Sequence, residues 1–289
     1  MNLPPAILPG KLEEKNKKAL VNLLTDEDLN VYRTVRQKII SYGPSSAQWM
    51  REHILSNDPL LRRRAHEIVD HFGSQDADTH MLAFCLNQGE DFDLEQSVLL
   101  LARTQYPNIN TEAYSAVLDG FADELRERLD LNGGAEHILH ITNEYLFREL
   151  KFMGDEQNFY DPDNSYLNRV LDRRMGNPIS LSLVYLLVAR RLRLPMVGIG
   201  LPGNFLVRFQ SSRAELYVDA FRGGRLMSKV DCIKHVVELR QRFDEGCLAP
   251  VSARRILLRI CANLHQIYMQ RKSPSQIERL QRYLFALAK

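Results

Sequence analysis

Ser180, Asn204 and Asp219 are the side chains whose types and order along the chain raise the question of catalysis. A serine hydroxyl at a helix start could act as a nucleophile, but it needs a strong base beside it because an alcohol is a weak acid. Asn204, in the stretch LPGNFLVRF, raises the question of whether it occupies a place where an enzyme would need a base. An amide takes up no proton near neutral pH, although it can donate and accept hydrogen bonds. Each residue also has a structural interpretation: Ser180 as a helix cap, Asn204 as a turn residue, and Asp219 as an arginine partner or backbone cap.

Three further pairs of reactive side chains lie close in sequence, but none forms a complete metal site. Two ligands three residues apart share a helix face, whereas zinc needs about four ligands. A calcium loop would read D-x-D-x-D-G and end in glutamate, and no such loop occurs. No phosphate-binding glycine loop is present either, so we predict neither a metal nor a cofactor. The pairs are Cys232 with His235, His137 with His140, and Asp161 with Asp163; Cys247, in a predicted loop, has no histidine near it in sequence.

The elements that would position these residues follow one another between residues 176 and 242. A helix over residues 178–195 can begin at Pro178 because the first turn leaves its N–H groups unpaired. It is apolar almost all round, which predicts burial in the middle of a domain. Short alternating runs then predict three strands, and a helix follows. The strands are predicted at residues 196–201, 205–209 and 215–220, and the helix at residues 231–242.

Helices are predicted on both sides of this central region. In the first ninety residues a weak repeat at an offset of 30 pairs Asp28 with Asp58 and Gly43 with Gly73, with apolar residues on one helical face between them. An aspartate before each helix and a glycine predicted to end it resemble HEAT-type repeats, although two unrelated helical hairpins explain the pattern equally well. Further helices are predicted at residues 111–130 and 136–152, and a tetratricopeptide-like pair after residue 251.

The composition is that of an ordinary globular protein. The 289 residues are 45% hydrophobic and 26% charged, enough for a sizeable core and about two domains. The net charge of +2 gives no reason to expect nucleic acid or an anionic membrane as a partner. Four unpatterned cysteines fit a reducing compartment. The N-terminus lacks the apolar core of a signal peptide, and no apolar run approaches the ~20 residues of a membrane span, so we expect a cytoplasmic protein.

The order of a buried helix, antiparallel strands and a further helix resembles that of transglutaminase-like and papain-like enzymes. More narrowly, the chain resembles the bacterial SirB-one family of transglutaminase-like proteins. The motifs that carry the resemblance are NSYLNRVLDRRMGNPISLSLVYLLVARRL, GLPGNFLVRF and VDAFRGG, and it covers roughly residues 90–289. It implies an α+β, predominantly helical fold. The expected organisation is a HEAT-like helical region at residues 1–89, a transglutaminase-like core with a small antiparallel sheet at 90–248, and a tetratricopeptide-like pair at 249–289.

The resemblance also implies where a catalytic triad would lie. In these enzymes a nucleophile at the start of the buried helix is favoured as an anion by the helix dipole, a histidine acts as base, and an aspartate orients the histidine. The nucleophile position, 17 residues before Pro195, is Pro178. Asn204 occupies the histidine position, where the family typically has L-P-G-H-F-L-V, and Asp219 is retained.

This pattern predicts a degraded triad and leaves three functions open. The first is a non-catalytic module that binds a protein or peptide partner in a cleft lined by Asn177, Ser180, Asn204, Phe205 and Asp219. The second is an atypical hydrolase or acyl-transfer enzyme with Ser180 as nucleophile and an unidentified base. The third is a scaffold in which the core is only structural and the cleft is unused.

Overall fold

The computed structural model describes residues 13–130, 133–210, 215–240 and 242–289. These residues form two compact units. The first contains the described residues up to Ala77 together with Thr104–Asn108, and the second contains Asp78–Arg103 and Ile109–Lys289. None of the helices in the described ranges is long and apolar enough to cross a membrane.

All the regular secondary structure in the described part of the first unit is helical. Asp28 caps its second helix by accepting a hydrogen bond from the Asn30 N–H at 2.7 Å, and Asp58 caps a later one by accepting from the Leu60 N–H at 2.8 Å. The two aspartates of the predicted repeat therefore have the same role. The elements are α1 (Glu14–Leu24), α2 (Leu29–Ser41), α3 (Ser45–Met50), the 3₁₀ helix η1 (Arg51–His53) and the beginning of α4 (Pro59–Asn87).

The prediction that Gly73 ends a helix is wrong, because α4 continues unbroken to Asn87. A Cβ atom at position 73 would lie 2.7 Å from the Cβ of Pro107. Gly73 thus allows another segment of the chain to approach the helix closely, and it does not terminate the helix.

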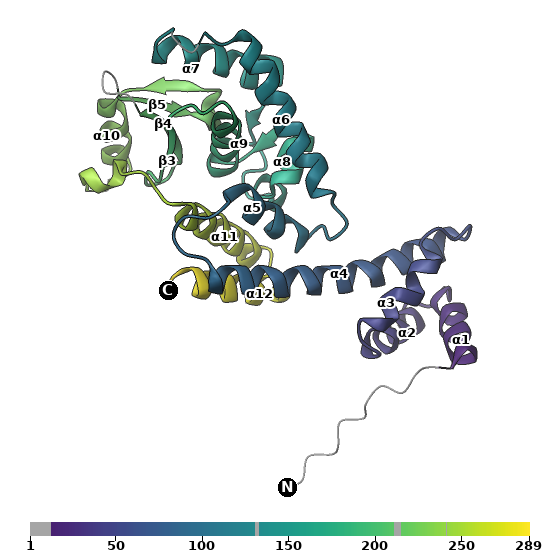
Figure 1. Cartoon of the computed structure of the whole chain (residues 1–289). Coiled ribbons are helices and arrows are strands. Elements are labelled where there is room, and N and C mark those ends of the chain that lie inside the picture. Colours follow the sequence, from purple (N-terminus) through teal and green to yellow (C-terminus); the bar gives the residue numbers. More distant parts are fainter. Residues whose placement is uncertain (1–12, 131–132, 211–214, 241) are drawn as a thin grey trace. The chain divides into compact units, whose positions relative to one another are not determined.

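The second unit carries the mixed α and β structure that the sequence predicts (Figure 1). Apart from the end of α4, its helices before the sheet are α5 (Leu94–Arg103), α6 (Thr111–Arg128), α7 (Ala135–Asn143), the π-helix η2 (Glu144–Glu149), η3 (Pro162–Asn164), α8 (Leu167–Arg173) and α9 (Pro178–Arg191). After the sheet begins they are η4 (Ala220–Arg222), α10 (Lys229–Glu238), η5 (Glu245–Leu248), α11 (Ala253–Gln270) and α12 (Pro274–Leu287).

The main sheet is antiparallel and has the order β3-β4-β5-β6. Val207 of β4 faces Val218 of β5, so the start of β4 lies beside the end of β5. The three predicted strands are confirmed, the first and third with an earlier end and the second shifted by one residue, and the fourth was missed because three residues show no clear alternation. The strands are β3 (Met196–Ile199), β4 (Leu206–Gln210), β5 (Glu215–Asp219) and β6 (Arg225–Met227); β1 (Met153–Gly154) and β2 (Met175–Gly176) form a separate parallel pair.

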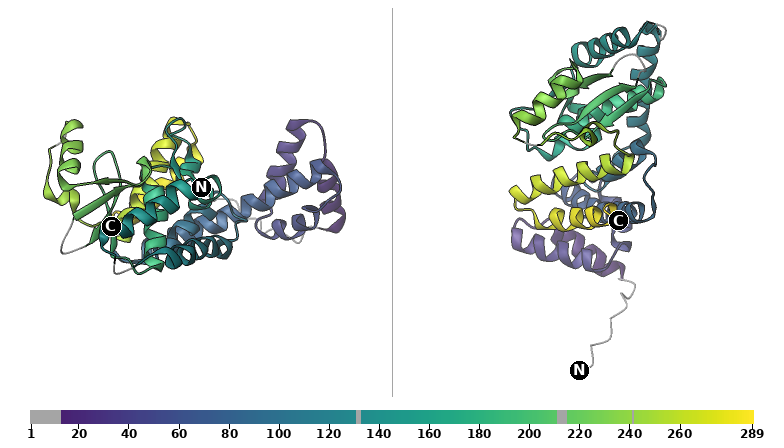
Figure 2. Two further views of the ribbon diagram at one scale, coloured as in Figure 1. Left: turned by 90° about the horizontal axis from the view of Figure 1, so that it is seen from above. Right: turned by 90° about the vertical axis from the view of Figure 1, so that its left-hand side faces the viewer.

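The predicted central helix is confirmed as α9, which packs against β3 and β4. Side chains all round it are buried, including Leu181, Leu183 and Val184. The two C-terminal helices, α11 and α12, lie side by side (Figure 2). Because α11 also contacts α5 and α9, this pair belongs to the same compact unit as the sheet.

The single helix predicted over residues 136–152 is only partly correct. Regular α-helix ends at Asn143 and gives way to the π-helix η2, in which the Leu150 N–H donates to the Tyr145 carbonyl at 2.9 Å. The chain then leaves the helix because the Met153 N–H donates to the Arg174 carbonyl at 2.9 Å as β1 begins. This pairing joins segments that local propensity cannot relate.

Candidate functional site

The start of α9 is fixed by a reciprocal capping box. The Asn177 side chain accepts hydrogen bonds from the Ile179 N–H at 3.1 Å and the Ser180 N–H at 3.0 Å. The Ser180 hydroxyl oxygen in turn accepts from the Asn177 N–H at 3.0 Å. Pro178 fills the first helical position, where no N–H is required. The residues GNPIS therefore begin the helix by local chemistry.

The Ser180 hydroxyl is buried and hydrogen-bonded to the neighbouring backbone. It donates to the Asn164 carbonyl at 2.6 Å, and its residue is 1% exposed. A Cβ atom at Gly176 would lie 2.5 Å from this oxygen, so the hydroxyl sits in a tightly packed corner. These contacts favour the capping role of Ser180 over a role as nucleophile.

Replacing Ser180 with alanine is expected to lower the free energy of unfolding by about 1–2 kcal/mol, because one helix cap and one buried carbonyl lose their partner. Urea unfolding followed by circular dichroism measures the change. Ser275→Ala, at an exposed position of α12, is the control and should leave stability nearly unchanged. Equal stability of Ser180→Ala and wild type would contradict the structural role.

Asn204 and Asp219 are joined by a hydrogen bond. The Asn204 side-chain N–H donates to Asp219 Oδ2 at 3.1 Å, and the Asn204 side-chain oxygen accepts from the Phe205 N–H at 2.7 Å. Asp219 Oδ1 accepts from the Arg222 N–H at 3.2 Å, and Asp219 is 6% exposed. The amide of Asn204 is thus held in one orientation between a carboxylate and the backbone.

Neighbouring helices hold the turn that carries Asn204. The Arg259 guanidinium of α11 donates to the Leu201 carbonyl at 3.2 Å and the Asn204 carbonyl at 3.0 Å. Burial lowers the pKa of Arg259. Gly203 has a φ of +70°, a conformation that favours glycine, and a Cβ there would lie 2.7 Å from Leu239, the residue that caps the end of α10. The turn is therefore positioned by α10 and α11 together.

A pocket of about 610 Å³ opens beside this turn. It brings together Pro178, Asn204 and Asp219, the three positions at which the sequence predicts a degraded triad. Asn177, Ser180 and Phe205, which the sequence also suggests for the cleft, are 2%, 1% and 0% exposed and do not line the pocket. The lining residues are Glu156, Phe159, Pro178, Gly203, Asn204, Asp219, Phe221, Arg222, Arg225, Met227 and His235.

This arrangement agrees with the comparison to known protein families. The family model of the transglutaminase-like superfamily matches residues 112–262, which is more than half of the chain. The chain belongs to the transglutaminase-like superfamily. The match includes α9, the main sheet and α10, and it spans every residue that lines the pocket.

Similar proteins occur in bacteria and in mammals. A UPF0162 protein of Xylella fastidiosa is 36% identical over 192 residues, which cover 62% of this chain and 66% of that protein. A UPF0162 protein of Pseudomonas aeruginosa is 34% identical over 153 residues, 52% of this chain and 54% of that protein. F-box only protein 21 of Mus musculus is 33% identical over 135 residues, 44% of this chain and 21% of that protein. The chain spans slightly less than two thirds of the length of the Xylella relative. No solved structure matches significantly.

Two reactive side chains of α10 lie in different surroundings in this transglutaminase-like core. Cys232 is fully buried, and burial, with the nearby charges of Asp231 and Asp219, raises the pKa of its thiol to about 12. A thiol in this state is a poor nucleophile. His235, one turn later, lines the pocket. The sequence placed Cys232 and His235 on one helix face, but it gave no signal that His235 reaches the same pocket as Asn204.

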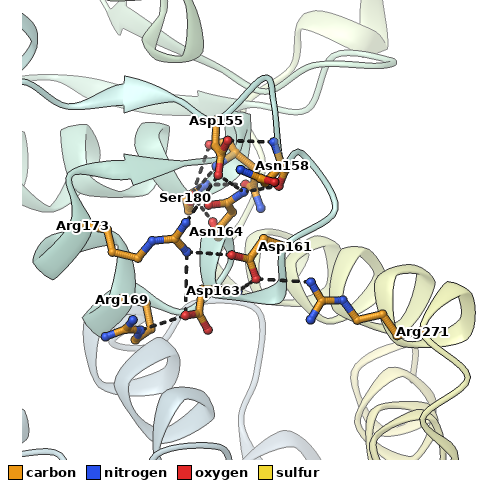
Figure 3. A network of polar contacts seen from close by, with 10 residues as sticks. Asp155, Asn158, Asp161, Asp163, Asn164, Arg169, Arg173, Ser180 and Arg271 are labelled. Carbon is orange, nitrogen blue, oxygen red and sulfur yellow. Dashed lines mark hydrogen bonds and ion pairs between the residues drawn. The ribbon is translucent and has the colours of Figure 1, made fainter.

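A polar network supports the loop that forms another part of the transglutaminase-like pocket (Figure 3). The Arg173 guanidinium donates to Asp161 at 3.0 Å and lies 3.5 Å from Asp155 and 3.8 Å from Asp163. Asn164 donates to Asp155 at 3.2 Å and accepts from the Ser180 hydroxyl through its carbonyl. The network therefore connects the loop to the start of α9. Among the described residues, no group of histidine, cysteine, aspartate and glutamate is arranged to hold a metal.

Proposed function

We propose that this chain is a non-catalytic member of the transglutaminase-like superfamily whose pocket binds a protein or peptide segment. The observation that carries the proposal is the orientation of Asn204. Its amide donates to Asp219 and accepts from the Phe205 N–H, at the position where a triad needs a base. An amide held in this way keeps much of the shape of a histidine site and supplies no proton acceptor near neutral pH.

The chemistry of the pocket wall supports the same proposal. Pro178 offers no nucleophile, and the pocket-lining residues in the described part of the chain include no serine, threonine or cysteine. Ser180 lies nearby but is buried within a helix cap. The volume of about 610 Å³ is within the usual range for small ligand sites, roughly 300–1,000 Å³. An open pocket without a nucleophile is suited to binding.

We further propose that the chain is a SirB-one type member with HEAT-like helices before the core and a tetratricopeptide-like pair after it. Helical repeats of these kinds usually present surfaces to other proteins. Such flanks support an interaction role for the chain as a whole.

A panel of ester and amide substrates tests the absence of catalysis. The wild-type protein is expected to show no turnover above that of Asp219→Asn. Turnover that disappears in Ser180→Ala, with the folded state retained, would instead establish the alternative of an atypical hydrolase or acyl-transfer enzyme.

Selection of peptides from a random library tests the binding role. Peptides selected on the wild-type protein should lose binding to Asn204→Trp, because the indole would fill the pocket. They should keep binding to Asn87→Trp, a change at an exposed position of α4 outside the pocket. Failure to select any peptide sensitive to Asn204→Trp would favour a scaffold whose pocket is unused.

A further inference from the structure

Among the described residues that line the first pocket, the charged groups leave the Arg225 side chain available for a ligand. Arg222 is paired with Glu156 at 2.7 Å. Asp219 is covered by the Asn204 amide and the Arg222 N–H. Arg225 is exposed and lines the pocket, and its side chain makes no hydrogen bond or ion pair with the residues that the structure describes. A guanidinium in this position is suited to a carboxylate.

Asp231, a carboxylate influenced by the charge of Arg225, already has hydrogen-bond partners of its own. The pKa of Asp231 is lowered first by hydrogen bonds from Ser228 and then by the charges of Lys234 and Arg225. Asp231 Oδ2 accepts from the Ser228 N–H at 2.9 Å and from its hydroxyl at 2.7 Å. These bonds cap α10, so Asp231 does not need Arg225 as a partner.

His235 adds a second polar group to the same wall. Its Nε2 atom is buried and has no hydrogen-bond partner within the described ranges. It lies near Gly203, at 3.9 Å from where a Cβ atom would stand. Buried polar atoms are normally hydrogen-bonded, and one without a partner beside a pocket is open to a bond from a ligand or water.

Besides these polar groups, the pocket wall contains two aromatic rings. Phe159 and Phe221 form an edge-to-face pair with ring centroids 5.9 Å apart, and both rings are only partly buried. Phe221, Arg222 and Glu156 also line a second hollow of about 630 Å³, whose wall includes Met153 and other apolar side chains together with the exposed Arg148. The two hollows therefore adjoin each other at Phe221, Arg222 and Glu156, and an extended chain could pass from one to the other with one side chain in each.

We propose that the bound segment is an acidic–apolar peptide, with an aspartate or glutamate side chain on Arg225 and an apolar side chain in the second hollow. The inference rests on the proposed binding function. The guanidinium of Arg225 matches a carboxylate, and Glu156 and Asp219 would repel a doubly charged phosphate more strongly than a singly charged carboxylate. Because the two hollows adjoin each other, they fit a peptide segment that continues in both directions better than they fit a chain end.

Binding of defined peptides tests this ligand class. The probes are fluorescein-labelled peptides, capped at both ends, in which one glutamate and one leucine are separated by varied numbers of glycine and serine residues. Fluorescence anisotropy should show binding for at least one spacing. Affinity should fall about tenfold when the glutamate becomes glutamine or when Arg225 becomes glutamine, and the two changes together should cost little more than either alone.

Matched variants and peptides separate the outcomes. Arg255→Gln, at an exposed position of α11 outside the pocket, should bind like wild type. Equal binding of the glutamine peptide, or binding that survives Arg225→Gln, would overturn the acidic–apolar assignment. The assignment would also be overturned if a glutamine peptide with a free C-terminus bound in an Arg225-dependent way, because a chain end would then be the ligand. Failure of every probe to bind would overturn it as well. If library-selected peptides still depend on Asn204 in those cases, the proposed function stands and only the ligand class is wrong.

Discussion

Replacing Arg173 with methionine is expected to lower the free energy of unfolding by about 3 kcal/mol. Arg173 is the cation that three carboxylates of one loop share, and its side chain is 24% exposed. Removing it leaves Asp155, which is 1% exposed, without its positive partner among a cluster of like charges. Urea unfolding at neutral pH measures the loss.

The same change should loosen the pocket, because the loop carries Glu156 and Phe159 of its wall. Peptides that bind the wild-type pocket should therefore bind the Arg173→Met variant more weakly. Arg190→Met is the control: Arg190 pairs with Asp93 at 3.4 Å, but the two side chains are 60% and 47% exposed. Exposed pairs contribute about 0–1 kcal/mol, so a similar loss in both variants would contradict the role of the network.

Replacing Arg254 with methionine is expected to destabilise the second unit by about 4 kcal/mol. The Arg254 guanidinium is buried and donates to the Leu287 carbonyl at 3.0 Å, the Ala286 carbonyl at 2.8 Å and the Gln88 carbonyl at 2.8 Å. These carbonyls lie at the ends of α12 and α4, where helices leave their last acceptors unpaired. A cation is also favoured at a helix C-terminus.

Arg255→Met provides a matched comparison one residue away, because Arg255 is exposed. Its substitution should change the free energy of unfolding by less than about 0.5 kcal/mol. Thermal and urea unfolding of both variants give the difference. Comparable losses at positions 254 and 255 would show that the three carbonyl bonds contribute little.

The position and start of α9 were largely predictable from the local sequence. Asn177, Pro178 and Ser180 together specify a helix start, since each supplies or removes a hydrogen bond within a few residues. The strand that ends at Asp219 and the turn that carries Asn204 were predicted for the same reason. Resemblance to transglutaminase-like proteins then indicated which positions matter, and the family match supports that fold.

Other features of the candidate site could not be predicted in this way. His235 and Arg225 lie on elements that follow Asp219 and reach the pocket through the packing of α10 and β6. Ser180 was considered as a nucleophile because its position is near the triad, but the partner that engages its hydroxyl, Asn164, lies 16 residues earlier. The hydrogen bond from Ser180 to this loop forms only when the loop is folded against α9.

The sequence by itself determined the local elements of this protein: helix caps, the buried central helix, the strands and the absence of an ionisable base at position 204. The tertiary structure decided which side chains meet. It placed Asn204 against Asp219, continued α4 through Gly73, and brought Arg254 to the ends of two helices. The physical reason is range: caps and turns depend on neighbours within a few residues, whereas the pocket and buried arginines depend on segments brought together by burial of the core.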